Sequence, residues 1–263
     1  MAVLNDTFSY NLNGDIIIAK NDNPDRIIDK IISNTEYDKL VRGIGLTFNK
    51  KFIGDLMFSG FYITSDILNK KTLWFDLDNA DKKQLGYFPL LNIWKIQTVL
   101  FFDNLHISRT VNRIKRNYEL RINYNFKNVL NNIIESHGNV WITPPLKKTL
   151  LKLNKGNYKA KSVSFEVYKN GELKAGEIGI ITGKIYTSYS GFYNESSAGS
   201  AQLAMMLNYL KDNNFIFCNF GTDDSVKNNL YKRKLGAVYI DRLDFIRLWR
   251  EGRKLKENAG NLL

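Results

Sequence analysis

The sequence predicts an α+β protein in which a small N-terminal lobe, residues 1–90, precedes a larger domain, residues 91–263. Three observations lead to this class. Stretches with helical spacing of apolar residues alternate with strand-like stretches, an Asn-Gly pair separates two of the strand-like stretches, and 263 residues are long for one compact module. We therefore expect a central mixed, largely antiparallel sheet flanked by helices.

The N-terminal lobe is predicted to contain both element types. Residues 1–20 alternate weakly and predict a strand or hairpin. Amphipathic helices are expected at residues 26–33, after an Asn-Pro-Asp start signal, and at residues 36–41. Residues 48–61 carry apolar side chains at helical spacing, and Gly60 is expected to end that helix.

The larger domain is predicted to alternate strands and helices. In chain order the expected elements are a strand at 94–102, helices at 125–136 and 144–153, strands at 162–168, 173–182 and 184–190, a helix at 198–213, a strand at 215–220, a helix at 225–235 and a strand at 237–240. Asn170-Gly171 is expected to close the first strand pair as a hairpin. This order is the one expected of GNAT-like acyltransferases, an analogy that concerns fold and not function.

The formal net charge is +12, and the basic residues are spread through the chain. A folded surface with this excess carries a positive field, and polyanions such as nucleic acids are its natural partners. The alternative is a surface of solvated lysines that bind nothing in particular. Charge alone leaves both interpretations open.

The compartment and the metal chemistry follow from what the sequence lacks. The N-terminal residues do not read as a signal peptide, and the most apolar stretch, residues 87–102, is interrupted by polar residues and is shorter than the roughly 20 residues that span a membrane. Cys218 is the single cysteine, and with His106 and His137 it does not form a zinc-type ligand pattern. We expect a cytoplasmic protein with no membrane contact, no metal and no cofactor.

One segment carries a specific resemblance to a known family. Residues 99–109 read VLFFDNLHISR and resemble the AVLFPDELHISR stretch of leucyl/phenylalanyl-tRNA-protein transferases. Residues 123–126, NYNF, and residues 140–143, VWIT, resemble the family's NYAF and TWIT motifs at comparable spacing. With weaker matches elsewhere, the resemblance covers roughly residues 50–250.

The resemblance implies an enzyme that moves an amino acid such as leucine or phenylalanine from aminoacyl-tRNA to the N-terminal α-amine of a protein or peptide. The product would be a degradation signal of an N-degron pathway. Chemically this is the aminolysis of an ester, which needs a neutral amine, a proton acceptor and hydrogen-bond donors to the oxyanion. The implied partners are aminoacyl-tRNA and the N-terminal segment of the acceptor, and the chain is expected to act as a monomer.

A second resemblance concerns the C-terminal part. Residues 219–222 and 231–237 resemble aminoacyltransferases of the FemABX kind, which also use aminoacyl-tRNA. Residues 233–237 nearly match the acetyl-CoA signature, but Val238 breaks it, so a CoA donor is disfavoured. The two resemblances indicate one superfamily and leave the acceptor undecided.

The family's catalytic positions are altered. Tyr189 stands where the family's GES motif has its glutamate, and a tyrosine, with an ordinary pKa of about 10, is a poor base at neutral pH. The family also has an aspartate and a glutamine on the strand after the long helix. Aligning on Cys218 puts Phe217 and Asn219 at these positions, whereas a shift of one residue puts Cys218 and Phe220 there. Either alignment loses the acid.

The resemblance, together with polar groups near the altered positions, predicts three sets of site residues. The catalytic set is Glu166, Tyr189 and Asn219; the substrate-binding set is Trp141, Ser190, Phe192 and Glu195; and the tRNA-binding set is His106, Arg109, Arg113, Lys232 and Arg233. Structural alternatives exist. Trp141 can be a core residue instead of stacking on the terminal adenine of tRNA, Glu166 can be a structural pair, and the basic residues can be a solvated helix face. Asp223 and Asp224 are further candidate carboxylates.

Three functions remain open from the sequence. The first is an active aminoacyl-tRNA-dependent transferase with substituted catalytic groups. The second is a GNAT-like or FemABX-like transferase that serves another amine acceptor. The third is a relative that keeps tRNA or peptide binding and has lost the chemistry, which the missing carboxylates would explain.

Overall fold

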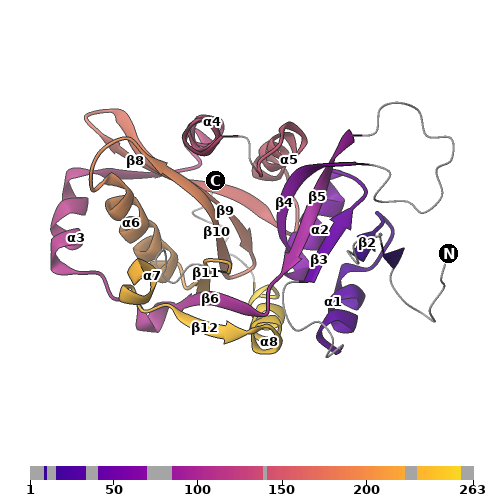
Figure 1. Cartoon of the computed structure of the whole chain (residues 1–263). Coiled ribbons are helices and arrows are strands. Elements are labelled where there is room, and N and C mark those ends of the chain that lie inside the picture. Colours follow the sequence, from indigo (N-terminus) through magenta and orange to yellow (C-terminus); the bar gives the residue numbers. More distant parts are fainter. Residues whose placement is uncertain are drawn as a thin grey trace.

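The computed structural model describes residues 9–10, 16–33, 41–69, 85–138, 141–222 and 230–255. Within these ranges the strands form a five-stranded and a seven-stranded sheet, and helices pack on both faces of the larger sheet (Figure 1). The predicted α+β class is confirmed. No helix among the described residues is long and apolar enough to cross a membrane.

The five-stranded sheet lies in the N-terminal part of the chain and has the strand order β1-β2-β3-β5-β4. The strands are β1 (Ser9–Tyr10), β2 (Ile16–Ile18), β3 (Val41–Gly45), β4 (Tyr62–Asn69) and β5 (Leu85–Ile93). β2 and β3 run parallel, and the other neighbours run antiparallel. Helices α1 (Pro24–Ser33) and α2 (Lys50–Ser59) pack together and add Ile28 and Leu56 to a core that extends to the larger sheet.

The seven-stranded sheet has the order β12-β6-β11-β10-β9-β8-β7. Its strands are β6 (Ile96–Phe101), β7 (Glu119–Ile122), β8 (Lys161–Lys169), β9 (Glu172–Thr182), β10 (Ile185–Tyr193), β11 (Phe217–Asn219) and β12 (Val238–Asp241). β10 and β11 are parallel, and every other pair is antiparallel. The prediction of a mixed, largely antiparallel sheet is therefore confirmed.

Helices cover the larger sheet unequally on its two faces. The helices are α3 (Arg109–Ile114), α4 (Phe126–His137), α5 (Pro144–Lys155), α6 (Ala198–Asp212), α7 (Leu230–Lys234) and α8 (Arg242–Gly252), with 3₁₀ turns η2 (Phe102–Asn104) and η3 (Lys115–Asn117) on either side of α3. α4 and α5 pack on the face whose core continues into the N-terminal sheet, and α6 packs on the other face (Figure 1). α8 places Phe245 and Trp249 against Phe217 of β11.

Local sequence signals explain several boundaries. The Asn49 side chain accepts hydrogen bonds from the Lys51 and Phe52 backbone N–H groups and caps α2, which Gly60 ends with a φ of 112°. Asn170 and Gly171 have φ values of 54° and 81° and form the tight turn between β8 and β9. The predicted stop at Gly60 and the predicted hairpin are both confirmed.

Other expectations differ from the structure. The helix predicted at 36–41 is wrong at Val41, which begins β3, and its other residues lie outside the described ones. The elements that were not predicted are β3, β4, β5, β7, α3 and α8. The division into residues 1–90 and 91–263 stays a prediction, and the chain passes from the first sheet to the second between Ile93 and Ile96.

The turn between β9 and β10 provides a test of how the C-terminal helix is held. Gly183 has a φ of 57°, and a Cβ atom there would lie 2.5 Å from the Gly252 carbonyl oxygen and 2.6 Å from that of Arg253. We expect Gly183→Ala to lower the free energy of unfolding by roughly 3 kcal/mol, because backbone must move away from backbone. Urea denaturation measures this loss.

Gly171→Ala is the matched control. Gly171 also has a positive φ, 81°, but nothing lies within 4 Å of its Cβ position. Only the left-handed conformation is penalised there, at about 1 kcal/mol. Equal losses in the two variants would contradict close contact between the turn and the end of α8.

Candidate functional site

The seven-stranded sheet opens between β10 and β11. The two parallel strands pair over a short stretch that ends at Thr187 and Asn219, where β11 stops while β10 continues. The register of β10 on β9 shifts between Ser188 and Ser190. Tyr189 is therefore the extra residue of a β-bulge, a feature that bends a strand and redirects its side chains.

An aromatic cluster lies beside this opening and joins the two sheets. The ring of Tyr62, from β4, stacks on that of Tyr189 with centroids 4.4 Å apart, and Trp94 and Trp141 lie 5.0 Å from Tyr62 and 5.8 Å from Tyr189 respectively. The Tyr62 hydroxyl donates to the Tyr189 carbonyl oxygen over 3.3 Å. The Ile63 backbone N–H donates to the Tyr189 hydroxyl over 3.0 Å.

Tyr189 and Trp141 are thus packed into the junction of the sheets. Burial raises the pKa of Tyr189 above its ordinary value, so its phenol is neutral and suits hydrogen bonding better than proton abstraction. The Trp141 ring is half-buried against the core, and its carbonyl oxygen accepts from the Ser65 hydroxyl over 2.8 Å. The catalytic role of Tyr189 and the adenine contact of Trp141 stay predictions.

Glu166 lies on β8 and is fully buried. One carboxylate oxygen accepts from the Ser164 hydroxyl over 2.7 Å and from the Asn125 backbone N–H over 2.8 Å, and the other accepts from the Tyr168 hydroxyl over 2.8 Å. These bonds hold the start of α4 against β8. The arrangement has the form of the structural pairing that was the alternative for this residue.

Asn219, Ser190 and Phe192 lie near the opening in different surroundings. Asn219 is buried, and its side-chain oxygen accepts from the Gly221 backbone N–H over 2.9 Å. Ser190 is half-buried on β10, and Phe192 is buried in the core on the α4 side. Among these three, Asn219 and Ser190 bring polar groups to the region of the opening.

Glu195 lies apart from Tyr189, in the turn between β10 and α6. Its carboxylate accepts from Lys169 over 2.6 Å and from the Tyr118 hydroxyl over 2.7 Å. The hydrogen bond from Lys169 is the largest cause that lowers the pKa of Glu195, and burial and the carboxylate raise the pKa of Tyr118 to about 12. Glu195 and Glu166 are therefore held in separate hydrogen-bond networks. Asp223 and Asp224 lie outside the described residues.

Glu177 is a buried carboxylate that the sequence analysis missed. It lies on β9, and it accepts from the Tyr186 hydroxyl over 2.9 Å and from the Ser188 hydroxyl. Burial raises its pKa to about 7, although both hydroxyls and the nearby charge of Lys232 act in the opposite direction. A lone carboxylate in the apolar run of residues 175–181 was the sequence signal that could have identified it.

The register places Glu177 on the sheet face opposite to Glu166. Glu177 pairs with Phe165, whose ring lies in the α6-side core together with Tyr186. The charge of Glu177 nevertheless acts on Tyr62. Burial raises the pKa of the Tyr62 phenol most, and Tyr189 and then Glu177 raise it further. Glu177 and the aromatic cluster are therefore within electrostatic reach of each other.

The predicted tRNA-binding residues gather around α3 and α7. The His106 backbone N–H donates to the Leu235 carbonyl oxygen over 2.9 Å, which joins the segment before α3 to the end of α7. The side chains of Arg109, Arg113 and Arg233 are exposed. Lys232 is half-buried, with its ammonium group 5.4 Å from the centre of the Phe220 ring.

Metal-binding clusters are not found in the described ranges, where no three His, Cys, Asp or Glu side chains gather in a suitable arrangement. Cys218 is buried, and burial raises the pKa of its thiol well above the ordinary value. A buried thiol with a raised pKa stays protonated and is a poor nucleophile.

The chain therefore has an α+β fold whose main sheet opens beside a buried carboxylate and an aromatic cluster. A model of the family described as "Leucyl/phenylalanyl-tRNA protein transferase" matches residues 99–250. The leucyl/phenylalanyl-tRNA–protein transferase of Campylobacter lari is 27% identical over 188 residues, which cover 68% of this chain and 84% of that protein. That of Flavobacterium johnsoniae is 30% identical over 175 residues, covering 61% and 79%.

Among solved structures, FemX is 8% identical with a TM-score of 0.43, and the likeness covers 89% of this chain and 82% of FemX. The family match extends over more than half of the sequence. The chain belongs to the leucyl/phenylalanyl-tRNA-protein transferase family.

The two hydrogen-bonded carboxylates differ in burial and can be tested as a pair. Glu166→Ala leaves one backbone N–H and two hydroxyls without their acceptor in the interior, and we expect the free energy of unfolding to fall by about 3 kcal/mol or more. Glu195→Ala removes partly exposed contacts that solvent screens, and it is expected to lower the free energy of unfolding far less than Glu166→Ala. Urea denaturation of both variants checks this, and a Glu166→Ala protein as stable as the unmodified one would contradict the structural pairing.

Proposed function

We propose that this chain is an enzyme that transfers an aminoacyl group from aminoacyl-tRNA to the N-terminal α-amine of a protein or peptide. The observation that carries this proposal is the family match over residues 99–250, which spans nearly all of the seven-stranded sheet and the helices from α3 into α8. The enzyme would act as a monomer in the cytoplasm, where charged tRNA and N-degron substrates meet.

The reaction sets chemical demands on the site. The nitrogen of the α-amine forms a bond to the ester carbonyl carbon, and the bond from that carbon to the terminal ribose oxygen of the tRNA breaks. One proton leaves the amine and one reaches the ribose oxygen. The site must therefore accept and return a proton and must stabilise the oxyanion that forms between the two steps.

Glu177 suits the role of proton acceptor better than the residues predicted from the resemblance. Its pKa of about 7 gives both an ionised and a protonated fraction near neutral pH, and an acid–base group works best with a pKa near the working pH. Tyr186 and Ser188 hold the carboxylate in place by hydrogen bonds. Glu177 would then replace the acid that the family carries at the position of Tyr189.

Polar groups beside the opening could serve the oxyanion and the donor. Asn219 accepts from the Gly221 N–H through its side-chain oxygen, so the NH₂ group of its amide is the hydrogen-bond donor that suits the oxyanion at this place. The Tyr62 hydroxyl, in contrast, uses its proton to bind the Tyr189 carbonyl oxygen. In this proposal Trp141 contacts the terminal adenosine of the tRNA, and Ser190 and Phe192 line the path of the aminoacyl group. Arg109, Arg113 and Arg233 contact tRNA phosphates.

A second function has a specific observation in its favour. Glu166 and Tyr189 are both buried and hydrogen-bonded within the chain, as expected of residues that have taken structural roles. A relative that binds tRNA and has lost the transfer chemistry would look the same at these two positions. Glu177 is the group that favours the active enzyme.

The experiment that tests the proposed function uses labelled amino acids on a mixed pool of charged tRNAs and a set of peptides with different N-termini. Transfer to a peptide α-amine above background would establish the activity and identify donor and acceptor together. tRNA binding without transfer to any peptide would contradict the proposal and favour the second function.

The pH dependence of transfer tests the role of Glu177. Its carboxyl pKa is raised to about 7, so the ionised, proton-accepting form accumulates as the pH rises through 7. We expect the transfer rate to rise over this range, which gives one rising limb of the pH–rate profile. Glu177→Gln should lower the rate roughly 100-fold or more and remove this limb.

The peptide amine supplies the internal control. Its pKa, about 8, gives a second limb that both proteins share. Initial rates at saturating peptide between pH 6 and pH 9 separate the two limbs. An unchanged profile in a folded Glu177→Gln protein would remove Glu177 from the mechanism.

A further inference from the structure

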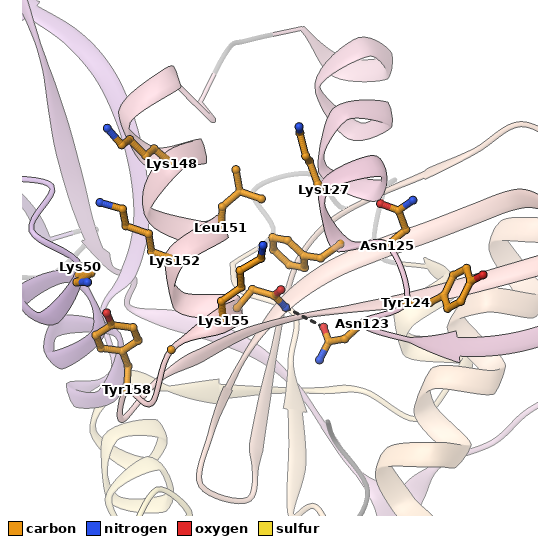
Figure 2. Close-up of a pocket in the computed structure, with 13 residues that line it drawn as sticks. Lys50, Asn123, Tyr124, Asn125, Lys127, Lys148, Leu151, Lys152, Lys155 and Tyr158 are labelled. Carbon is orange, nitrogen blue, oxygen red and sulfur yellow. Dashed lines mark hydrogen bonds between the residues drawn. The ribbon is translucent and has the colours of Figure 1, made fainter.

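A hollow of about 750 Å³ lies between α4 and α5. Figure 2 shows α5 on one side of it, the start of α4 on the other and residues 123–125 beneath. Lys50 and Tyr158 complete its wall next to α2. None of the predicted catalytic or substrate-binding residues lines it.

The hollow is strongly basic. Among the residues that the structure describes, the lining contains five lysines, namely Lys50, Lys127, Lys148, Lys152 and Lys155, and no aspartate or glutamate. The three lysines of α5 recur at the spacing of one helix face. Like charges this close repel each other, so the arrangement costs stability in the absence of an anion.

Hydrogen bonds make the floor of the hollow rigid. Asn123 has a φ of 53°, and its side-chain oxygen accepts from the Asn154 side chain over 2.9 Å and from the Ser164 backbone N–H over 3.0 Å. The Asn125 backbone N–H donates to Glu166, as described above. The network of Glu166 therefore fixes one wall of the hollow, and the lysines project from a fixed frame.

An exposed aromatic ring stands at the edge of the hollow. Tyr124 is 65% exposed, and the Arg121 guanidinium lies 4.6 Å from its ring centre, which holds the ring in place. Lysines beside an exposed, fixed aromatic face are the combination by which proteins bind single-stranded nucleic acid, with phosphates on the cations and a base stacked on the ring.

We propose that this hollow is a second RNA-binding site that takes the phosphates of the donor tRNA. The inference rests on the proposed function for the identity of the RNA. α3 and α7 lie toward one end of the molecule and α4 and α5 above the sheet (Figure 1), so the hollow and the predicted tRNA-binding residues are separate surfaces that one extended RNA would contact together. Its ligand is a polyanion with regularly spaced phosphates.

The test compares two triple variants with the same change in net charge. Lys148, Lys152 and Lys155 become Gln in the hollow variant, and Lys20, Arg247 and Lys254, which are exposed elsewhere, become Gln in the control. Binding of uncharged tRNA is measured by fluorescence anisotropy over a range of salt concentrations. For the hollow variant we expect the affinity for tRNA to fall by about tenfold or more. The slope of log affinity against log salt should become shallower by about 2 to 3.

The control should keep the affinity and slope of the unmodified chain, and replacing the same three hollow lysines by Arg should restore both. A hollow variant that binds tRNA with the affinity and slope of the control would overturn the inference, whatever its transfer activity.

A second readout is transfer from an aminoacyl ester of adenosine, which has no phosphates. The hollow variant should use this donor at the unmodified rate, and an equal loss with both donors would also overturn the inference. If the unmodified chain transferred from neither donor, the proposed function would be contradicted. The tRNA-binding result alone would then decide whether the hollow binds RNA.

Discussion

The stacking of Tyr189 on Tyr62 is the contact on which the arrangement of the site depends. It joins β10 of the larger sheet to β4 of the N-terminal sheet, and it is reinforced in both directions, by the Tyr62 hydroxyl on the Tyr189 carbonyl and by the Ile63 N–H on the Tyr189 hydroxyl. These bonds stabilise the bulge in β10. The bulge in turn lies where β10 and β11 separate, so the same contact that joins the sheets also shapes the opening.

A carboxylate at the position of Tyr189 would be buried among aromatic rings with the Ile63 N–H as the donor seen there, whereas the buried Glu166 has three donors, so this surrounding favours a neutral phenol. The chain instead has its buried carboxylate on the neighbouring strand. Glu177 receives two hydroxyl donors and the field of Lys232, and burial still leaves its pKa near 7. Glu166, in contrast, is bound by three donors and holds α4 in place. The two glutamates lie on opposite faces of the sheet and serve different purposes in this account.

Sequence patterns predicted the parts of the fold that local chemistry determines. Asn49 and Gly60 bound α2, and the Asn170-Gly171 turn closes a hairpin, because capping and left-handed turns depend on a few neighbouring residues. α8 was missed although local signals mark it, because Asp241 caps its first turn and Phe245, Ile246 and Trp249 recur at helical spacing.

The site was less predictable because elements that are distant in the sequence form it. Motif comparison led to Tyr189 and Glu166, whose surroundings become visible only when β4 and α4 pack against them. Strand parity decides which face a side chain occupies, and the bulge at Tyr189 shifts that parity without a sequence signal. The basic hollow combines α2, α4 and α5, so no single segment reveals it. The overall positive charge indicated a polyanion partner and could not locate its contacts.

The most direct test of this account compares Tyr189→Phe with Glu177→Gln in transfer from one charged tRNA to one peptide, with equal folded fractions verified by circular dichroism. Tyr189→Phe keeps the ring stacked on Tyr62 and removes only the hydroxyl. The account predicts transfer close to that of the unmodified chain for Tyr189→Phe and background transfer for Glu177→Gln. Loss of transfer in Tyr189→Phe together with full activity in Glu177→Gln would contradict it.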